Sequence, residues 1–191
     1  MIKAIDTVYK GYRFRSRLEA RWAVFFDTCG FKWVYEPQGY EINGVKYLPD
    51  FQLYDVDRRF WAEEEKQKPF FVEVKGEMDG VSRRKIDNFS RFFPVYVVSN
   101  IPYALSLYDY LDTIYDTWYN DKDYMLYSFA TIDGDSYPAA LFVNNQGQPA
   151  IAGPDHYDDL RNMNVKKTLQ ALRAARSKRF EWNEREEGVE P

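Results

Sequence analysis

The segment Phe70-Phe-Val-Glu-Val-Lys75 is the most informative stretch of this sequence. Successive side chains of a strand point to opposite faces, so its even-numbered apolar residues share one face. Glu73 and Lys75 then lie on the opposite face as close neighbours. The alternation therefore predicts a strand that is apolar on one side and carries a carboxylate and an ammonium group on the other.

A second acid belongs to the segment Tyr47-Leu-Pro-Asp-Phe51, where Asp50 directly follows a proline and interrupts an otherwise apolar strand. The strand is expected to cover Val45–Leu53 and to follow the turn Asn43-Gly44, which is a strong hairpin signal. If this strand lies beside the first one, Asp50 converges on Glu73.

The surrounding elements are predicted by periodicity and turn signals. A first helix begins after Ser16, a good N-cap, and ends at Gly30. The elements expected after it are strands Phe31–Glu36, Tyr40–Ile42 and Val45–Leu53, an exposed loop Asp55–Lys68, strand Phe70–Lys75, helix Val81–Phe93 and strand Pro94–Ser99. This order predicts an α/β fold with helices packed on a mixed sheet, and residues 1–100 are enough for a compact domain.

Residues 101–191 are expected to form an α+β C-terminal extension packed on that core. Its expected elements are a helix over Pro102–Asn120, short strands within Met125–Ile151 with turns at Asp133-Gly134 and Asn145–Gly147, a basic closing helix Asp158–Arg179 and an acidic tail Glu181–Pro191. Leu105 and Tyr108 recur at helical spacing, which favours packing in a core or interface; stacking on bases is the alternative for the aromatic residues. We expect the extension to bind DNA, to form a homodimer or to dock a protein partner.

Composition narrows the class of protein. The chain has 191 residues, 45% of them hydrophobic, so most of it should fold. It has no run of about 18 apolar residues and its start lacks signal-peptide form, which argues against a membrane span or membrane partner. The single cysteine, Cys29, excludes an internal disulfide framework or a cysteine zinc cluster and is expected to serve packing. We expect a cytoplasmic protein, in the host cytoplasm if a phage encodes it.

The net charge of −4 argues weakly against a nucleic-acid binder, but the basic residues are unevenly distributed. One cluster precedes and enters the first helix, and another opens the second helix. Their members are Arg13, Arg15 and Arg17, and Arg83, Arg84 and Lys85. Such clusters suit the backbone phosphates of DNA. The alternative is ordinary solvated surface charge.

The two acids indicate a metal site. Two carboxylates that meet at the end of a sheet repel each other, and a hard divalent cation such as Mg²⁺ relieves that repulsion. A lysine beside a metal-bound water can position the water, or take its proton if the pKa of the lysine is lowered. Two carboxylates, a divalent cation and a lysine are together suited to the hydrolysis of a phosphodiester. In the alternative, Asp50 is a turn-like residue at a strand edge, and Glu73 with Lys75 is an ion pair on a wet face.

Glu19 is the candidate third acid. It lies at the edge of the apolar stripe of the first helix, so it can face the sheet. However, Ser16-Arg-Leu-Glu19 also fits the capping box, in which the glutamate bonds back to the helix start. Spacing alone leaves both interpretations open.

Pro49-Asp50 followed by Glu73-Val-Lys75, after a helix that carries Glu19 in Arg15-Ser-Arg-Leu-Glu-Ala-Arg-Trp22, resembles the PD-(D/E)xK nuclease superfamily. The resemblance covers roughly residues 10–100 and is greatest to members from bacteriophages and of the transposon-end endonuclease type. It implies a restriction-endonuclease-like core. It also implies that Asp50, Glu73 and the Val74 carbonyl bind Mg²⁺ (or Mn²⁺ as a substitute), that Lys75 handles the nucleophile, and that Glu19 assists the metal.

The expected function is therefore a Mg²⁺-dependent endonuclease that hydrolyses DNA phosphodiesters, of phage or mobile-element origin. One alternative is a catalytically silent module that keeps the nuclease fold and binds nucleic acid or protein. Another is a viral structural or interaction protein whose working part is the C-terminal half. The complete set of Asp50, Glu73 and Lys75 favours the enzyme.

Overall fold

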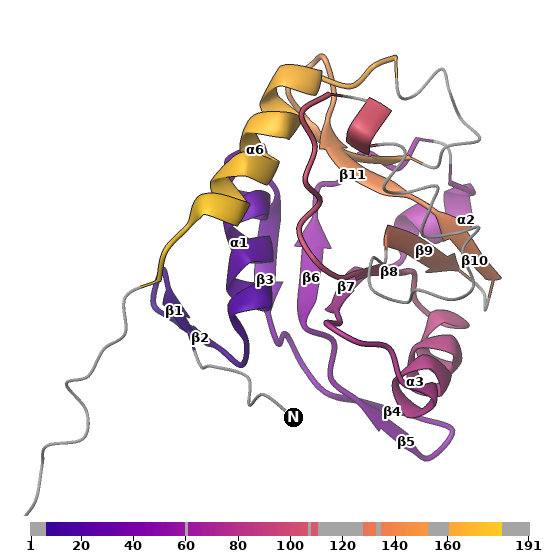
Figure 1. The fold of residues 1–191 in the computed structure, drawn as a ribbon. Helices are drawn as coiled ribbons and strands as arrows, with labels where there is room; N and C mark the ends of the chain where they lie inside the picture. Colours follow the sequence, from indigo (N-terminus) through magenta and orange to yellow (C-terminus); the bar gives the residue numbers. More distant parts are fainter. Residues whose placement is uncertain are drawn as a thin grey trace, which may run out of the picture.

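The protein is described from a computed structural model. The described residues are 7–59, 61–106, 108–110, 128–132, 135–152 and 161–180, with 128–132 and 135–138 described by their backbone only. They form a mixed α/β structure in which a sheet has helices on both faces (Figure 1).

The central sheet has the strand order β10-β9-β8-β7-β6-β3. Its strands are β3 (Lys32–Tyr35), β6 (Phe51–Tyr54), β7 (Phe70–Val74), β8 (Val95–Val98), β9 (Ser128–Ile132) and β10 (Asp135–Pro138). The pair β7–β8 is parallel and the other neighbours are antiparallel, which confirms the predicted mixed sheet flanked by helices. The strand that carries Glu73 is therefore central, between β6 and β8.

The helix α1 (Arg17–Cys29) covers one face of this sheet and lies against α6 (Val165–Ser177), as Figure 1 shows. Its predicted ends are confirmed: the Ser16 side chain accepts a hydrogen bond from the Glu19 N–H, and Gly30 is left-handed with φ 87°. The Trp22 ring Nε1–H donates to the Ser99 carbonyl at 2.7 Å. Cys29 is buried, as a packing residue would be.

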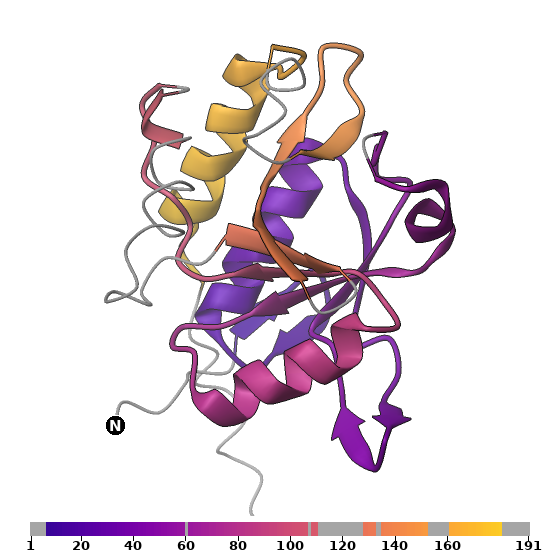
Figure 2. The same cartoon turned by 90° about the vertical axis from the view of Figure 1, so that its right-hand side faces the viewer.

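The helix α3 (Gly80–Ser90) covers the other face of the sheet (Figure 2). Its Ile86 and Phe89 are buried in a cluster with Phe71 and Val97, and the rings of Phe71 and Phe89 are 5.3 Å apart. Because alternate residues of β7 enter the two cores, α3 packs on the same face of the sheet that carries Glu73.

The expectation of one strand over Val45–Leu53 is wrong. The chain forms β5 (Val45–Tyr47), which pairs with β4 (Tyr40–Ile42) in a separate two-stranded sheet, before it enters β6. Pro49, between β5 and β6, has no N–H for a ladder. The predicted turn is confirmed, since Asn43 and Gly44 have φ of 52° and 73°, as a type I′ hairpin requires. The hairpin projects from the body of the molecule (Figure 2).

The loop expected over Asp55–Lys68 contains a short helix, α2 (Glu63–Gln67), so that expectation is wrong in part. The Arg58 guanidinium holds this segment by donating to the carbonyls of Glu65, Lys66 and Lys68, at 2.6 to 3.2 Å. These fixed contacts give the segment a defined path without a strand.

A hairpin that the sequence did not predict precedes α1. It consists of β1 (Thr7–Tyr9) and β2 (Tyr12–Phe14), which pair antiparallel. Phe14 is buried in the main core, and its ring lies 4.5 Å from that of Tyr35. The hairpin therefore anchors the residues that lead into α1, including Arg15.

Strands of the C-terminal extension continue the main sheet, because β9 pairs with β8. The hairpin of β11 (Ala140–Val143) and β12 (Pro149–Ala152) confirms strands in this region and turns at Gly147, with φ 82°. The closing helix begins at Val165, later than expected. The turn Asp133-Gly134, the tail 181–191 and most of the helix expected over 102–120 lie outside the described residues.

Leu105 and Tyr108 do not enter the core, because their exposed fractions are 60% and 79%; packing of these residues in an interface stays a prediction. Ala104 and Tyr110 of this segment enter the core, and the Tyr110 hydroxyl donates to the Leu141 carbonyl at 2.7 Å. Across the described part of the chain, no helix has both the length and the apolar character that crossing a bilayer would require.

Candidate active site

Asp50 and Glu73 come together where β6 meets β7. The register pairs Leu53 with Phe70 and Phe51 with Val72, so one further step places Asp50 opposite Glu73. The Asp50 Oδ2 atom accepts a hydrogen bond from the backbone N–H of Val74 at 2.8 Å. Both carboxylates are buried, with side-chain exposures of 3% for Asp50 and 4% for Glu73. The burial of Glu73 contradicts the wet face of the alternative, but Asp50 lies in a bend directly before β6, and the ion pair of Glu73 with Lys75 is present, as that alternative expected.

Each of these buried carboxylates has a cationic partner. The Glu73 Oε1 atom lies 2.5 Å from the Lys75 ammonium. The Asp50 Oδ1 atom lies 2.7 Å from the Arg15 guanidinium, which comes from the segment between β2 and α1. Arg15 was predicted only as a phosphate contact, so its ion pair with Asp50 is a result of the tertiary structure.

Tyr47, at the end of β5, is a site residue that sequence reasoning missed. Its hydroxyl donates to the Glu73 Oε2 atom at 2.7 Å, and its ring is buried against Phe89. Burial and the charges of Glu73 and Asp50 raise the pKa of Tyr47, so the hydroxyl stays a proton donor. Alternation along β5 does not distinguish this tyrosine from a core aromatic, because the contact requires the hairpin to fold over β7.

Glu19 makes the contacts of a helix cap and also lies near Asp50. Its Oε1 atom accepts from the Ser16 hydroxyl at 2.7 Å, and its Oε2 atom accepts from the Tyr35 hydroxyl at 2.6 Å and from the Arg15 backbone N–H at 3.2 Å. The carboxylate is near enough to raise the pKa of Asp50. The N-cap hydrogen bond from the Glu19 N–H to Ser16 is thus present, but the glutamate oxygens accept from the Ser16 hydroxyl and the Arg15 N–H, whereas a capping box uses the Ser16 N–H. Glu19 also borders the Asp50–Glu73 pair.

Burial is the largest cause of a strongly raised pKa at Asp50, and the negative charges of Glu73 and Glu19 raise it further, against the opposing effect of Lys75. The pKa of Lys75 is lowered by burial but raised more by Glu73 and Asp50, so it lies above its ordinary value. Lys75 is therefore an ammonium at neutral pH. These groups leave Asp50 with a strong preference for a proton or a cation nearby.

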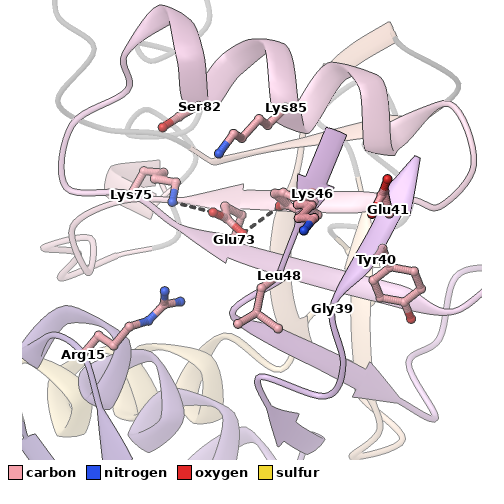
Figure 3. A pocket seen from close by; sticks show the side chains of 11 residues that line it. Arg15, Gly39, Tyr40, Glu41, Lys46, Leu48, Glu73, Lys75, Ser82 and Lys85 are labelled. Carbon is pink, nitrogen blue, oxygen red and sulfur yellow. Dashed lines mark hydrogen bonds and ion pairs between the residues drawn. The ribbon is translucent and has the colours of Figure 1, made fainter. Parts of the chain in front are cut away.

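A cavity of about 590 Å³ opens beside this pair (Figure 3). It is lined by Arg15, Gly39, Tyr40, Glu41, Lys46, Tyr47, Leu48, Glu73, Lys75, Ser82 and Lys85. Figure 3 shows Lys85 on α3 and Arg15 beside α1 on opposite sides of the Glu73–Lys75 pair, while the β4–β5 hairpin closes a third side. The lining has four cationic side chains and two carboxylates, so it suits an anionic ligand.

The predicted phosphate-binding residues divide into two groups. Arg15 and Lys85 line the cavity, whereas Arg13, Arg17, Arg83 and Arg84 do not. Arg83 forms an ion pair with Asp87 at 2.8 Å. Lys46, on β5, lines the cavity and was not predicted; its approach depends on the hairpin, and no local pattern marks it.

The start of α3 is a poorer phosphate site than the sequence suggested. Asp79 is its N-cap, and the Asp79 Oδ1 atom accepts hydrogen bonds from the N–H groups of Val81 and Ser82 at 2.9 and 2.7 Å. A phosphate would have to compete with this carboxylate for those donors. The side chains of Ser82 and Lys85, rather than these amides, face the cavity.

The chemistry of Asp50 and Glu73 fits Mg²⁺ in part. Both offer the hard carboxylate oxygens that this ion prefers, and their partners Arg15 and Lys75 are side-chain cations that can move. In the part of the chain that the structure describes, no three histidine, cysteine, aspartate or glutamate side chains are grouped as a ready metal site. A metal would thus use this pair first, with Glu19 adjacent.

Comparisons with known proteins provide no relative from which a role could be carried over. The sequence matches no protein-family model, and neither the curated proteins nor the solved structures contain a match.

Proposed function

We propose that this protein is a Mg²⁺-dependent endonuclease that hydrolyses DNA phosphodiesters and has a restriction-endonuclease-like core of phage or mobile-element origin. The proposal depends on one observation above all: two buried carboxylates, Asp50 and Glu73, meet where β6 joins β7, and Glu73 and Lys75 line a cationic cavity. Buried acids in such a pair are costly unless a cation or a reaction makes use of them.

In this proposal Asp50, Glu73 and the Val74 carbonyl hold the metal. A bound Mg²⁺ would lower the pKa of a coordinated water and neutralise phosphate charge. Lys75 orients the attacking water and stabilises the negative charge that develops on the phosphate. Tyr47 fixes the Glu73 carboxylate through its hydrogen bond.

The cavity supplies the contacts for the DNA backbone. Lys46 on the hairpin, Lys85 on α3 and Arg15 beside α1 approach the acids from three sides. Cations at these positions attract phosphates and fix the strand without reading bases.

Cleavage tests the proposal directly. Purified protein with Mg²⁺ or Mn²⁺ is expected to nick or cut plasmid DNA or a member of a labelled panel of duplex, branched and single-stranded DNA. Asp50→Ala and Lys75→Ala should abolish cutting while circular dichroism shows a retained fold. Lys32→Ala is the matched control, because its ion pair with Asp55 is exposed and lies at the far end of β3. If both site variants cut as fast as the unchanged protein, the activity comes from a contaminating nuclease and the proposal is contradicted.

A catalytically silent nucleic-acid or protein-binding module is the second candidate. It is favoured by the pairing of both acids with cations of the protein itself, since Arg15 and Lys75 already balance their charges. A silent module would bind DNA with no dependence on a divalent ion and would cut no member of the panel. It would also tolerate Asp50→Asn without loss of binding.

A further inference from the structure

Arg15 bridges two carboxylates, those of Asp50 and Glu36, and so pairs with one of the two acids proposed to hold the metal. Its Nη2 atom lies 2.7 Å from Asp50 Oδ1, and its Nε atom lies 2.8 Å from Glu36 Oε1. The side chain of Arg15 is 56% exposed and lines the cavity, whereas that of Asp50 is 3% exposed. Arg15 therefore reaches from the open cavity to a buried acid.

The main chain of Arg15 is held independently of this bridge. Its backbone N–H donates to Glu19 Oε2 and to the Tyr35 hydroxyl, each at 3.2 Å. The guanidinium can consequently leave Asp50 by side-chain rotation alone, without unfolding the start of α1. A long, half-exposed side chain of this kind changes rotamer rapidly.

Glu36 has an unusual backbone that places it for this contact. Its φ of 46° is left-handed, which is unfavourable for a residue with a side chain. The Glu36 N–H donates to the Asp50 carbonyl at 2.8 Å, so the same residue is tied to the backbone of the acid that Arg15 neutralises. Glycine would adopt this conformation more easily, and what glutamate adds is a carboxylate for Arg15.

We propose that Arg15 is an exchangeable cation: it occupies Asp50 until a divalent ion binds there, and Glu36 then retains it at the edge of the cavity, facing the DNA phosphates. This inference depends on the metal-dependent function proposed above. Arg15 thereby balances the charge of the buried Asp50 when no metal is bound, as Lys75 does for Glu73. After the exchange, its charge is available to substrate.

The exchange makes Arg15 a competitor of the metal. Removing the competitor should tighten metal binding, and removing Glu36 should weaken it, because Arg15 then has only Asp50 as an anion. We expect Arg15→Gln to bind Mn²⁺ about 3- to 10-fold more tightly than the unchanged protein, as expected for loss of one partly exposed ion pair. Glu36→Gln should lower Mn²⁺ affinity by a similar factor.

The experiment is a titration of the full chain with Mn²⁺, followed by the electron paramagnetic resonance signal of the free ion. It includes Arg15→Gln, Glu36→Gln, the double variant, Arg15→Lys, Asp50→Asn and the control Lys32→Gln. Glu36→Gln should have no effect once Arg15 is already glutamine, and Arg15→Lys should lie between the unchanged protein and Arg15→Gln. Binding to a labelled duplex with Ca²⁺ present should weaken in Arg15→Gln, although metal binding has tightened.

The outcomes separate the two proposals. If Asp50→Asn loses Mn²⁺ binding but Arg15→Gln equals the unchanged protein, the exchange is wrong and the metal site stands. If no variant binds Mn²⁺, both proposals fail. An equal effect of Glu36→Gln with and without Arg15 would overturn the role of Glu36. Should Arg15→Gln not fold, Arg15→Lys with Glu36→Gln gives the same test.

Discussion

The Asp50 carboxylate accepts a hydrogen bond from the backbone N–H of Val74, the residue that separates Glu73 from Lys75. This one contact joins β6 to β7 at the end of their ladder and brings the two acids to the same place. Because Asp50 is also paired with Arg15, its side chain links three elements of the fold. The consequences can be measured residue by residue.

Asp50→Asn should remove cleavage and stabilise the metal-free protein. The amide keeps the size of the carboxylate and can still accept from Val74, and it removes a buried charge beside Glu73. It also breaks the ion pair with Arg15, but that guanidinium is half-exposed and keeps Glu36 as a partner, so the loss is small. We expect a gain on the order of 1 kcal/mol, which corresponds to a rise in Tm of about 2–4 °C. Differential scanning calorimetry without divalent ions checks this; a fall in Tm would contradict the electrostatic account.

The same substitution should change how stability depends on pH. Because the pKa of Asp50 is raised in the folded state, that state retains a proton which the unfolded chain releases above about pH 3.9. This contribution to stability is complete below that value and is lost as pH rises through the pKa of the folded state. Urea unfolding from pH 4 to 8 should therefore show a steeper decline with pH in the unchanged protein than in Asp50→Asn.

Lys75→Met should lower the cleavage rate by about 10²–10³-fold, because it removes a charge that stabilises the developing phosphate charge. Because Lys75 acts in this proposal as a cation and not as a general base, deprotonation of this residue should not raise the rate between pH 7 and 9. Single-turnover rates across this range test both statements. If cleavage instead required a deprotonated Lys75, the rate would rise with pH, and this rise would be absent in Lys75→Arg.

Tyr47→Phe should weaken both stability and activity. It deletes the donor to Glu73 in a buried site and should cost about 1–1.5 kcal/mol of unfolding free energy. We expect cleavage to fall about tenfold, because Glu73 loses its fixed orientation. Tyr35→Phe is the matched variant: it removes a similar hydrogen bond from Glu19, at 2.6 Å. Equal losses of activity in both would argue against a special role for Tyr47.

Variants of Ser16 and Glu19 distinguish a helix-capping role of Glu19 from a role at the metal site. Ser16→Ala removes the N-cap of α1 and should lower stability by about 1 kcal/mol with cleavage retained. Glu19→Gln keeps hydrogen-bonding atoms near Ser16 and Tyr35 but removes the charge near Asp50. It should raise the metal concentration needed for half-maximal cleavage. If the two variants lose stability and activity in proportion, Glu19 is a cap alone.

The cavity cations should contribute to DNA affinity more than an equally exposed cation elsewhere on α3. Lys46→Ala and Lys85→Ala should each reduce the slope of log affinity against log salt by about 1. Arg84→Ala, on the same helix but outside the cavity lining, is the control and should change the slope less. Fluorescence anisotropy with a labelled duplex at several salt concentrations gives these slopes. A larger change in slope for Arg84→Ala would indicate that DNA binds outside the cavity and would contradict this prediction.

The strand that carries Glu73 and Lys75, the helix α1 with its caps and the turn at Asn43-Gly44 could be predicted from the sequence, because each depends on interactions between residues near in the chain. The convergence of Asp50 on Glu73 could be anticipated, since antiparallel pairing of adjacent strands fixes which residues face each other.

The partners of the two acids were decided by the tertiary structure alone. Tyr47 reaches Glu73 because the chain leaves the central sheet after β3 and the end of the hairpin packs against β7 and α3, which an expected single strand over Val45–Leu53 does not show. Arg15 meets Asp50 from 35 positions away. The residues next to Tyr47 and Arg15 in the sequence do not indicate these distant partners. The packing of α1 and the hairpin on the sheet determines which side chains lie beside the two acids.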